Sequence, residues 1–230
     1  MKNSQDYSGK VQKFYRQLKR EYGKVEKPDY ADPVGALVYG IISELKSESW
    51  AQGAYKRILG HFVDFNELRV SRSGEILEVL GDDTAVTHRI SSTLVEALRG
   101  LFRKYNTVSL DALENMSKRP ARQVLSKIEG VSRFVVNYCM LMSLQSHAMP
   151  LTARMIEYLR SKELVHPESD EQEIEGFLMH QISASGAYKF YTYLRLKSEG
   201  SGSKAKKRVK KVTKKKSKKK ASKKRTHKGW

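Results

Sequence analysis

The stretch LSKIEGVSRFVVNYCMLM, residues 125–142, predicts two helices joined by a tight turn. Leu125 and Ile128 are placed to close the first helix against a core, and residues 130–132 form the turn. Ser132 is a favourable N-cap for the second helix. Because the free N–H groups at the start of a helix attract anions, this hairpin is a candidate site for a phosphate group.

Positive charge surrounds the hairpin in the sequence. Lys127 and Arg133 flank the turn as mobile cations, and Arg119 and Arg122 lie just upstream, while Val131 is expected to anchor the turn inward. An ordinary helix–glycine–helix turn has the same local pattern. The hairpin alone is therefore a weak indication of binding, and the rest of the chain has to support it.

The chain before Glu199 has a helical pattern nearly throughout. Asp32 is an expected N-cap with Pro33 in the first helical turn, and Ser49 is expected to begin the next helix. Hydrophobic spacing and breaker residues predict about ten helices, at residues 7–23, 33–46, 49–62, 73–81, 88–105, 109–116, 119–128, 132–146, 151–162, 170–183 and 185–198. No alternating strand pattern is present, so residues 1–199 are predicted to form one all-α domain.

Composition excludes several classes of protein. The 230 residues are 39% hydrophobic, enough for one sizeable core or two small lobes. Cys139 is the single cysteine, so a disulfide framework and a four-cysteine zinc or iron–sulfur site are excluded. The first ten residues lack the apolar run of a secretory signal, and no apolar stretch is long enough to span a membrane. We expect a soluble intracellular protein without a metal or another cofactor.

The net charge of +19 is concentrated at the C-terminus. Residues 203–230 contain fourteen Lys, two Arg and no acidic residue, and residues 1–202 carry only +3. Residues 200–203 are expected to be a flexible linker, and residues 204–230 a disordered lysine-rich tail. Such a tail binds nucleic-acid phosphates by counterion release, here through Lys207, Arg208, Lys210, Lys211, Lys214, Lys215, Lys216, Lys218, Lys219 and Lys220.

The sequence resembles the helix-hairpin-helix DNA glycosylases, the endonuclease III-like superfamily of base-excision repair. Residues 128–136, IEGVSRFVV, stand where that family has its hairpin. Three further segments are similar to parts of that family. Its opening segment is matched by DPVGALVYGIISELKSES, from Asp32. Its approach to the hairpin is matched by HRISSTLVEALRGLFRKYNTVSLDAL, from His88, and the segment after the hairpin by MPLTARMIEYL, from Met149. The resemblance covers residues 32–196 in helix order. It implies two helical lobes with the hairpin near their junction and an N-terminal helix packed against the last helices.

The chain departs from that family at the residues that carry its chemistry. A bifunctional family member uses a lysine amine as the nucleophile together with a carboxylate. Phe134 stands at the lysine position, and Thr152, eighteen residues further on, stands at the aspartate position. Arg154 replaces a nearby histidine, Leu45 replaces the helix-wedging amide, and Ser132 replaces the second hairpin glycine. A positive φ at Ser132 would be strained. The resemblance therefore assigns no catalytic residue in this chain.

Few other side chains offer substitute chemistry. Glu44 and Glu48, one helical turn apart, are expected on a solvated face, and Glu129 at the surface. Lys46 is a remote candidate for a substitute nucleophile. Cys139, on the apolar stripe of the hairpin helix, is expected to be an inert buried thiol.

Three hypotheses follow from these residues. The leading one is a monomeric protein that binds double-stranded DNA on a glycosylase scaffold without catalysis, through Lys127, Gly130, Val131, Ser132, Arg133 and the tail. The second is an active DNA glycosylase with relocated catalytic residues. The third is an RNA-binding or protein-binding adaptor. In each case no membrane is involved, and DNA association would place the protein in the cytoplasm or nucleoid, or in the nucleus of a eukaryote.

Overall fold

The structure, a computed structural model, describes residues 4–200, so the predicted tail and nearly all of the predicted linker lie outside it. Within that range the chain forms eleven α-helices and one 3-10 helix, with no strand. They are α1 Ser4–Tyr22, α2 Pro33–Leu45, α3 Glu48–His61, α4 Phe65–Val70, α5 Ser73–Leu80, α6 Ala85–Tyr105, η1 Asp111–Leu113, α7 Lys118–Leu125, α8 Arg133–Met142, α9 Ala153–Ser161, α10 Glu171–Gln181 and α11 Ala184–Ser198. The predicted all-α class is confirmed.

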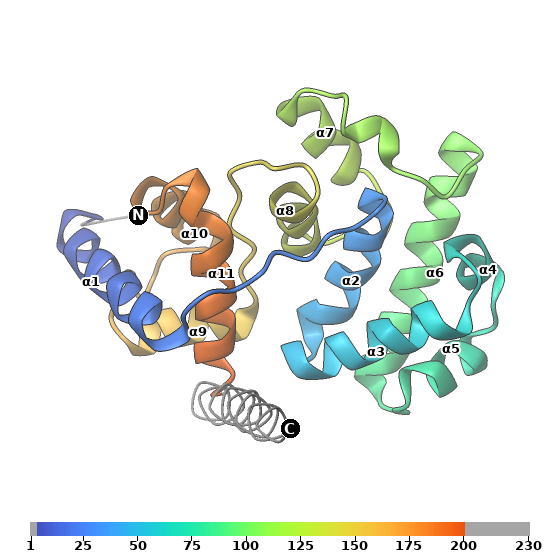
Figure 1. Ribbon diagram of the computed structural model, residues 1–230, viewed down its shortest axis with the longest axis horizontal. Coiled ribbons are helices and arrows are strands. Elements are labelled where there is room, and N and C mark those ends of the chain that lie inside the picture. Colours follow the sequence, from blue (N-terminus) through green and yellow to red (C-terminus); the bar gives the residue numbers. More distant parts are fainter. Residues whose placement is uncertain (1–3, 201–230) are drawn as a thin grey trace, which may run out of the picture.

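The helices form two groups on either side of α8 (Figure 1). One lobe contains α2 to α6, and the other contains α1 and α9 to α11. The segment between α1 and α2 crosses from one lobe to the other (Figure 1). This arrangement places the hairpin, which joins α7 to α8, at the junction of the lobes.

Helix α2 is the central helix because its sequence is apolar on every face. Asp32 caps it by accepting a hydrogen bond from the Val34 N–H, and every residue from Pro33 to Ser43 is buried. The neighbouring helix α8 approaches it closely at Gly40, where an added Cβ would lie 3.2 Å from Val135 Cγ1. Two buried helices in close contact give the hairpin a rigid support.

The N-terminal helix returns to pack against the last helices, as the resemblance implied. The Tyr15 and Phe190 rings meet edge to face with centroids 5.4 Å apart, and the Tyr15 hydroxyl donates to the Gly186 carbonyl over 3.2 Å. The Tyr193 hydroxyl donates to the carbonyl of Gly23, just after α1 ends. The second lobe is therefore closed by residues from both ends of the described chain.

Several predicted boundaries are wrong. The N-cap of α3 is Ser47, which accepts from the Trp50 N–H, rather than Ser49. Helix α4 was not predicted, because six residues capped by Asp64 are too few to show a hydrophobic period. Helix α6 begins earlier than predicted, at a Thr84–Thr87 capping box. The predicted helix at residues 109–116 is reduced to the single turn η1.

Candidate nucleic-acid interface

The hairpin turn is built on Gly130, whose φ of +72° lies in the left-handed region that favours glycine. The Val131 N–H donates to the Ile128 carbonyl over 3.3 Å and closes the turn. Ser132 has φ −79° and ψ 167°, so the strain considered for this residue is absent. Its hydroxyl accepts from the Val135 N–H over 3.2 Å, which confirms Ser132 as the N-cap of α8.

Several backbone donors remain free at this turn. Among the hydrogen bonds formed within residues 4–200, none uses the N–H of Gly130, Ser132, Arg133 or Phe134 as its donor. The N–H groups of the first helical turn have no intrahelical acceptor and carry the positive end of the helix dipole. The backbone of the hairpin is therefore arranged as the sequence predicted for a phosphate site.

Arg133 and Arg122 beside the hairpin are fixed, so the description of Arg133 as a mobile cation was wrong. Arg133 donates from Nε to the carboxylate of Glu175 over 2.7 Å, and this hydrogen bond raises the pKa of Arg133. The Asn137 amide donates to the other Glu175 oxygen over 2.7 Å and accepts from Arg122 over 2.6 Å. Glu175 is buried and hydrogen-bonded to Arg133 and Asn137, so it holds Arg133 directly and Arg122 through Asn137. Lys127 is exposed, as predicted.

Acidic side chains also lie against the turn. Burial raises the pKa of Glu44, and a hydrogen bond with Ser132 partly offsets that rise. Glu44 is therefore half-buried beside the hairpin, rather than on a solvated face as predicted. Burial and the neighbouring Glu175 raise the pKa of Glu171 at the start of α10. When ionised, these carboxylates would repel an anion at the turn and so counteract the free backbone donors.

Phe134 is one of the largest fully buried side chains, with 2% of its surface exposed. Its ring stacks near that of Tyr138, with centroids 6.0 Å apart, and the Cζ of Arg195 lies 6.0 Å from its centre. At the other position of interest, the Thr152 hydroxyl accepts from the Met155 N–H over 3.3 Å and caps α9. Thr152 is also buried, and both residues therefore have structural contacts.

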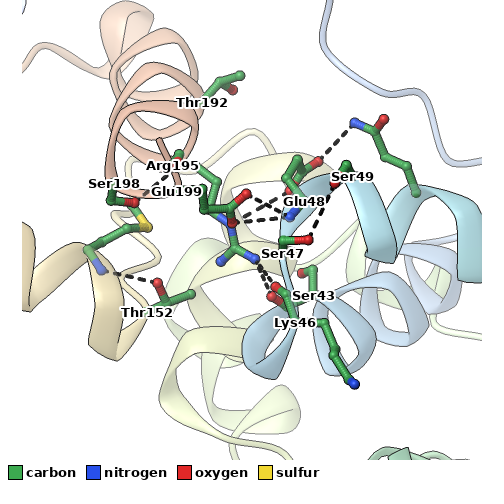
Figure 2. A network of polar contacts seen from close by, with 12 residues as sticks. Ser43, Lys46, Ser47, Glu48, Ser49, Thr152, Thr192, Arg195, Ser198 and Glu199 are labelled. Atoms are coloured by element: carbon green, nitrogen blue, oxygen red, sulfur yellow. Dashed lines mark hydrogen bonds and ion pairs between the residues drawn. The ribbon is translucent and has the colours of Figure 1, made fainter. Parts of the chain in front are cut away.

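A polar network joins the two lobes at the end of α11 (Figure 2). The Arg195 guanidinium donates to the carbonyls of Ser43 and Lys46, the latter over 2.6 Å. Its Nε lies 2.6 Å from Oε1 of Glu199, whose carboxylate accepts in turn from the Glu48 N–H at 2.9 and 3.1 Å. The last turn of α11 is thus tied to the loop between α2 and α3.

Glu48 has a role that its sequence context did not reveal. Its Oε1 accepts from the Tyr39 hydroxyl over 2.6 Å and from the Gln52 amide over 3.1 Å. Its Oε2 is buried and accepts no hydrogen bond, with Arg195 Nε 3.8 Å away. The prediction that Glu48 faces solvent was wrong. The only signal in the sequence was the spacing of Arg195 and Glu199, four residues apart on the last helix.

Glu48 and Arg195 line a cavity of about 480 Å³ between the lobes. The cavity walls come from α2, α3, α8, α11 and the segment that precedes α2, and they contain six tyrosines: Tyr30, Tyr39, Tyr55, Tyr138, Tyr188 and Tyr191. Tyr191 is buried, but its hydroxyl has no hydrogen-bond partner in the described part of the chain. The cavity therefore combines aromatic rings with unsatisfied polar atoms.

The remaining substitute candidates have structural explanations. Lys46 Nζ pairs with Asp82 at 2.5 Å and lies 4.8 Å from the centre of the Trp50 ring. Glu129 is exposed and pairs with Arg103. Cys139 is fully buried, and burial raises the pKa of its thiol. No three His, Cys, Asp or Glu side chains gather as metal ligands between residues 4 and 200. None of the helices there has the length and apolar character that a membrane crossing requires.

Comparison with solved structures identifies similar folds. Endonuclease III trapped in a covalent intermediate with DNA has a TM-score of 0.66 and 12% identity, over 82% of this chain and 84% of that chain. A thermostable thymine-DNA glycosylase has a TM-score of 0.62 and 13% identity, over 85% and 88% of the two chains. The 3-methyladenine DNA glycosylase of H. pylori, bound to 1,N6-ethenoadenine, has a TM-score of 0.63 and 11% identity, over 84% and 98%.

The sequence alone gives no corresponding match. No protein-family model matches it, and neither does any curated protein. Identities of 11–13% establish the likeness of the fold, while the side chains at each position have to be judged from this chain itself. The fold implied by the hairpin and its flanking segments is confirmed.

Proposed function

We propose that this chain binds double-stranded DNA without cleaving the bond between base and sugar. The proposal starts from its fold, which is the fold of the helix-hairpin-helix DNA glycosylase superfamily. Solved proteins of this fold include complexes of endonuclease III with DNA and of a Clostridium acetobutylicum 8-oxoguanine glycosylase/lyase with double-stranded DNA. The free backbone donors of the hairpin support contact with DNA phosphates. We propose that the protein acts as a monomer in contact with the chromosome.

The observation that carries the non-catalytic part is the burial of Phe134. By resemblance this is the lysine position, and here an aromatic ring with no nucleophile fills it at 2% exposure. Thr152, at the carboxylate position, is used as a helix cap and carries no charge at neutral pH. Both replacements favour a scaffold that holds a duplex and performs no glycosylase chemistry.

The lysine-rich tail supplies most of the affinity in this proposal. The cations beside the hairpin are held by Glu175, and Glu44 and Glu171 oppose phosphate there. Residues 203–230 carry +16, against +3 for the rest of the chain. Binding that depends on the tail is electrostatic and independent of base sequence.

Salt titration of duplex binding tests the proposal. If the tail neutralises about ten phosphates, the logarithm of the association constant falls against log salt with a slope of about −9. Removal of residues 203–230 should flatten this slope sharply, whereas an unchanged slope would exclude the tail as the main anchor. Competition among duplex DNA, structured RNA and an acidic protein at one salt concentration then separates a DNA-binding protein from an RNA or protein adaptor.

One observation favours a second function, a working DNA glycosylase with relocated chemistry. Glu48 presents a buried carboxylate oxygen without a hydrogen-bond partner at the cavity between the lobes. A carboxylate held there could stabilise positive charge on a sugar or orient a water molecule. Borohydride trapping on abasic DNA tests a lyase, and release of free base tests a glycosylase that uses water.

A further inference from the structure

The cavity between the lobes, called here the tyrosine chamber, has the properties of a cation site. Its six tyrosines present ring faces and hydroxyl oxygens, both of which attract a positively charged group. Tyr138 contacts two other tyrosines of the lining. Its ring stacks against that of Tyr39, with centroids 5.5 Å apart, and meets that of Tyr191 edge to face, with centroids 6.0 Å apart. Burial raises the pKa of all three hydroxyls, so they remain neutral.

The charged groups of the chamber also favour a cation. Glu48 lies inside it, and Glu26 and Asp29 lie at its exposed rim. Arg195 is the one cationic side chain of the lining, and its charge is already compensated by Glu199 at 2.6 Å. The lining is therefore negative overall. Three buried atoms of the lining have no hydrogen-bond partner: Glu48 Oε2, the Tyr191 hydroxyl and Arg195 Nε. Glu48 Oε2 and the Tyr191 hydroxyl can accept from an N–H donor, and Arg195 Nε is already paired with Glu199 as an ion pair.

We propose that the tyrosine chamber binds the ammonium group of a lysine from the C-terminal segment of the same chain. Thr192 and Leu196 of α11 line the chamber, and α11 ends at Ser198, so that segment starts beside it. Fourteen lysines and no carboxylate follow within residues 203–230. This segment combines many lysines with a short distance along the chain to the chamber.

The chain length needed to reach the chamber is short. From Gly200 back to Thr192 the helix axis covers about 12 Å, at about 1.5 Å per residue. An extended segment from Gly200 to Lys204 spans about 13 Å, and one to Lys207 about 23 Å, at about 3.3 Å per residue. Lys204, Lys206 and Lys207 are thus the first lysines able to reach it. A connection this short gives the bound lysine an effective concentration in the millimolar range.

Occupation by a lysine would divide the C-terminal segment into two functional parts. The first lysines would be held in the chamber, and the later lysines would remain available for DNA phosphates. A lysine held there would compete with a free nucleobase for the same tyrosine rings. The inference is independent of the DNA-binding proposal, because it concerns a contact within the free protein.

Carbodiimide cross-linking of the intact protein tests this contact, because the reagent joins a carboxylate to a nearby amine as an amide with loss of water. Mass spectrometry should find Glu26, Asp29 or Glu48 joined to Lys204, Lys206 or Lys207. Cross-links of these lysines only to other carboxylates, such as those of residues 168–175, would overturn the proposal, as would the absence of any cross-link from them.

Nuclear magnetic resonance of the tyrosine rings provides a second readout on the full-length chain. The substitutions K204Q, K206Q and K207Q together should shift the ring signals of Tyr188 and Tyr191, whereas K218Q, K219Q and K220Q together should leave them unchanged. Tyr105, outside the chamber, is the internal control. Identical spectra for the two triple variants would overturn the proposal. So would a free nucleobase that shifts the same rings equally well with and without the first three lysines.

Discussion

The Cζ of Arg195 lies 6.0 Å from the centre of the Phe134 ring. This contact brings the start of α8 and the end of α11 together at the junction of the lobes. Arg195 is 2% exposed, donates to the Ser43 and Lys46 carbonyls and forms an ion pair with Glu199. A guanidinium remains charged at every physiological pH, so the position that the resemblance assigns to a reactive amine is here an aromatic ring beside a permanent cation.

Phe134→Ala should destabilise the fold by about 3–5 kcal/mol, because it removes a fully buried ring between α8 and α11. Phe134→Leu, which keeps much of the volume, should cost clearly less. Urea unfolding followed by circular dichroism measures both values. A loss below about 1 kcal/mol for Phe134→Ala would show that this ring does not hold the lobes together.

Arg195→Met should lower the free energy of unfolding by about 3–5 kcal/mol, since the Glu199 carboxylate would stay buried without its cation. Lys197→Met is the matched control on the same helix. The Lys197 pair with Glu21 is more exposed, at 29% and 20% for the two side chains, so its loss should cost at most about 1 kcal/mol. Equal effects for the two substitutions would contradict the assignment of Arg195 as the link between the lobes.

Glu175→Gln should strengthen duplex binding while it weakens the fold. The substitution removes the negative charge that holds Arg133. It also leaves the Asn137 amide, which accepts from Arg122, with a poorer partner. We expect a stability loss of about 1–3 kcal/mol and a tighter complex by fluorescence anisotropy. Glu163→Gln, at an exposed carboxylate just after α9, controls for net charge. Unchanged affinity in a folded Glu175→Gln variant would place the hairpin away from DNA.

Glu44 should make the stability of the protein fall as the pH rises through its titration. Burial raises the pKa of Glu44 in the folded state, so the folded protein binds more protons than the unfolded chain between the two pKa values. Stability is therefore lost from about pH 4 upwards to the raised pKa, and is not regained above it.

Glu44→Gln removes this titration and should be more favourable to stability at pH 7 than at pH 4, relative to wild type. Urea unfolding at both pH values measures the difference. Glu157→Gln, on the exposed face of α9, controls for the loss of one negative charge. A stability difference that is the same at both pH values would contradict the burial of Glu44 against the hairpin.

The fold was predictable from the sequence where local signals agree. Asp32 with Pro33, Gly130 with Ser132, and the apolar run of α2 each specify a helix boundary or a buried helix through backbone and burial preferences alone. Together with helix order they led to the confirmed fold. The six-residue helix α4 could not be predicted, because it is shorter than two hydrophobic periods.

The candidate site was much less predictable. The spacing of residues was enough to assign Phe134 and Thr152 to their positions in the resemblance. It could not predict the contact of Arg195 with the end of α2 and the α2–α3 loop, because this contact joins residues about 150 positions apart. For the same reason Glu48 and Glu44 were assigned to solvent. Both face residues from distant helices, Glu48 from α11 and Glu44 from α8, and a helical pattern gives no information on which neighbour covers which face.

Release of free base from lesion-bearing duplexes tests the central claim most directly. Purified protein is incubated with duplexes that carry oxidised, alkylated, deaminated or mismatched bases, and the released bases are measured by mass spectrometry alongside binding to the same duplexes. The account predicts binding to every duplex and no released base above the level without protein. Base release that is lost on Glu48→Gln, in a variant that remains folded and still binds DNA, would contradict it.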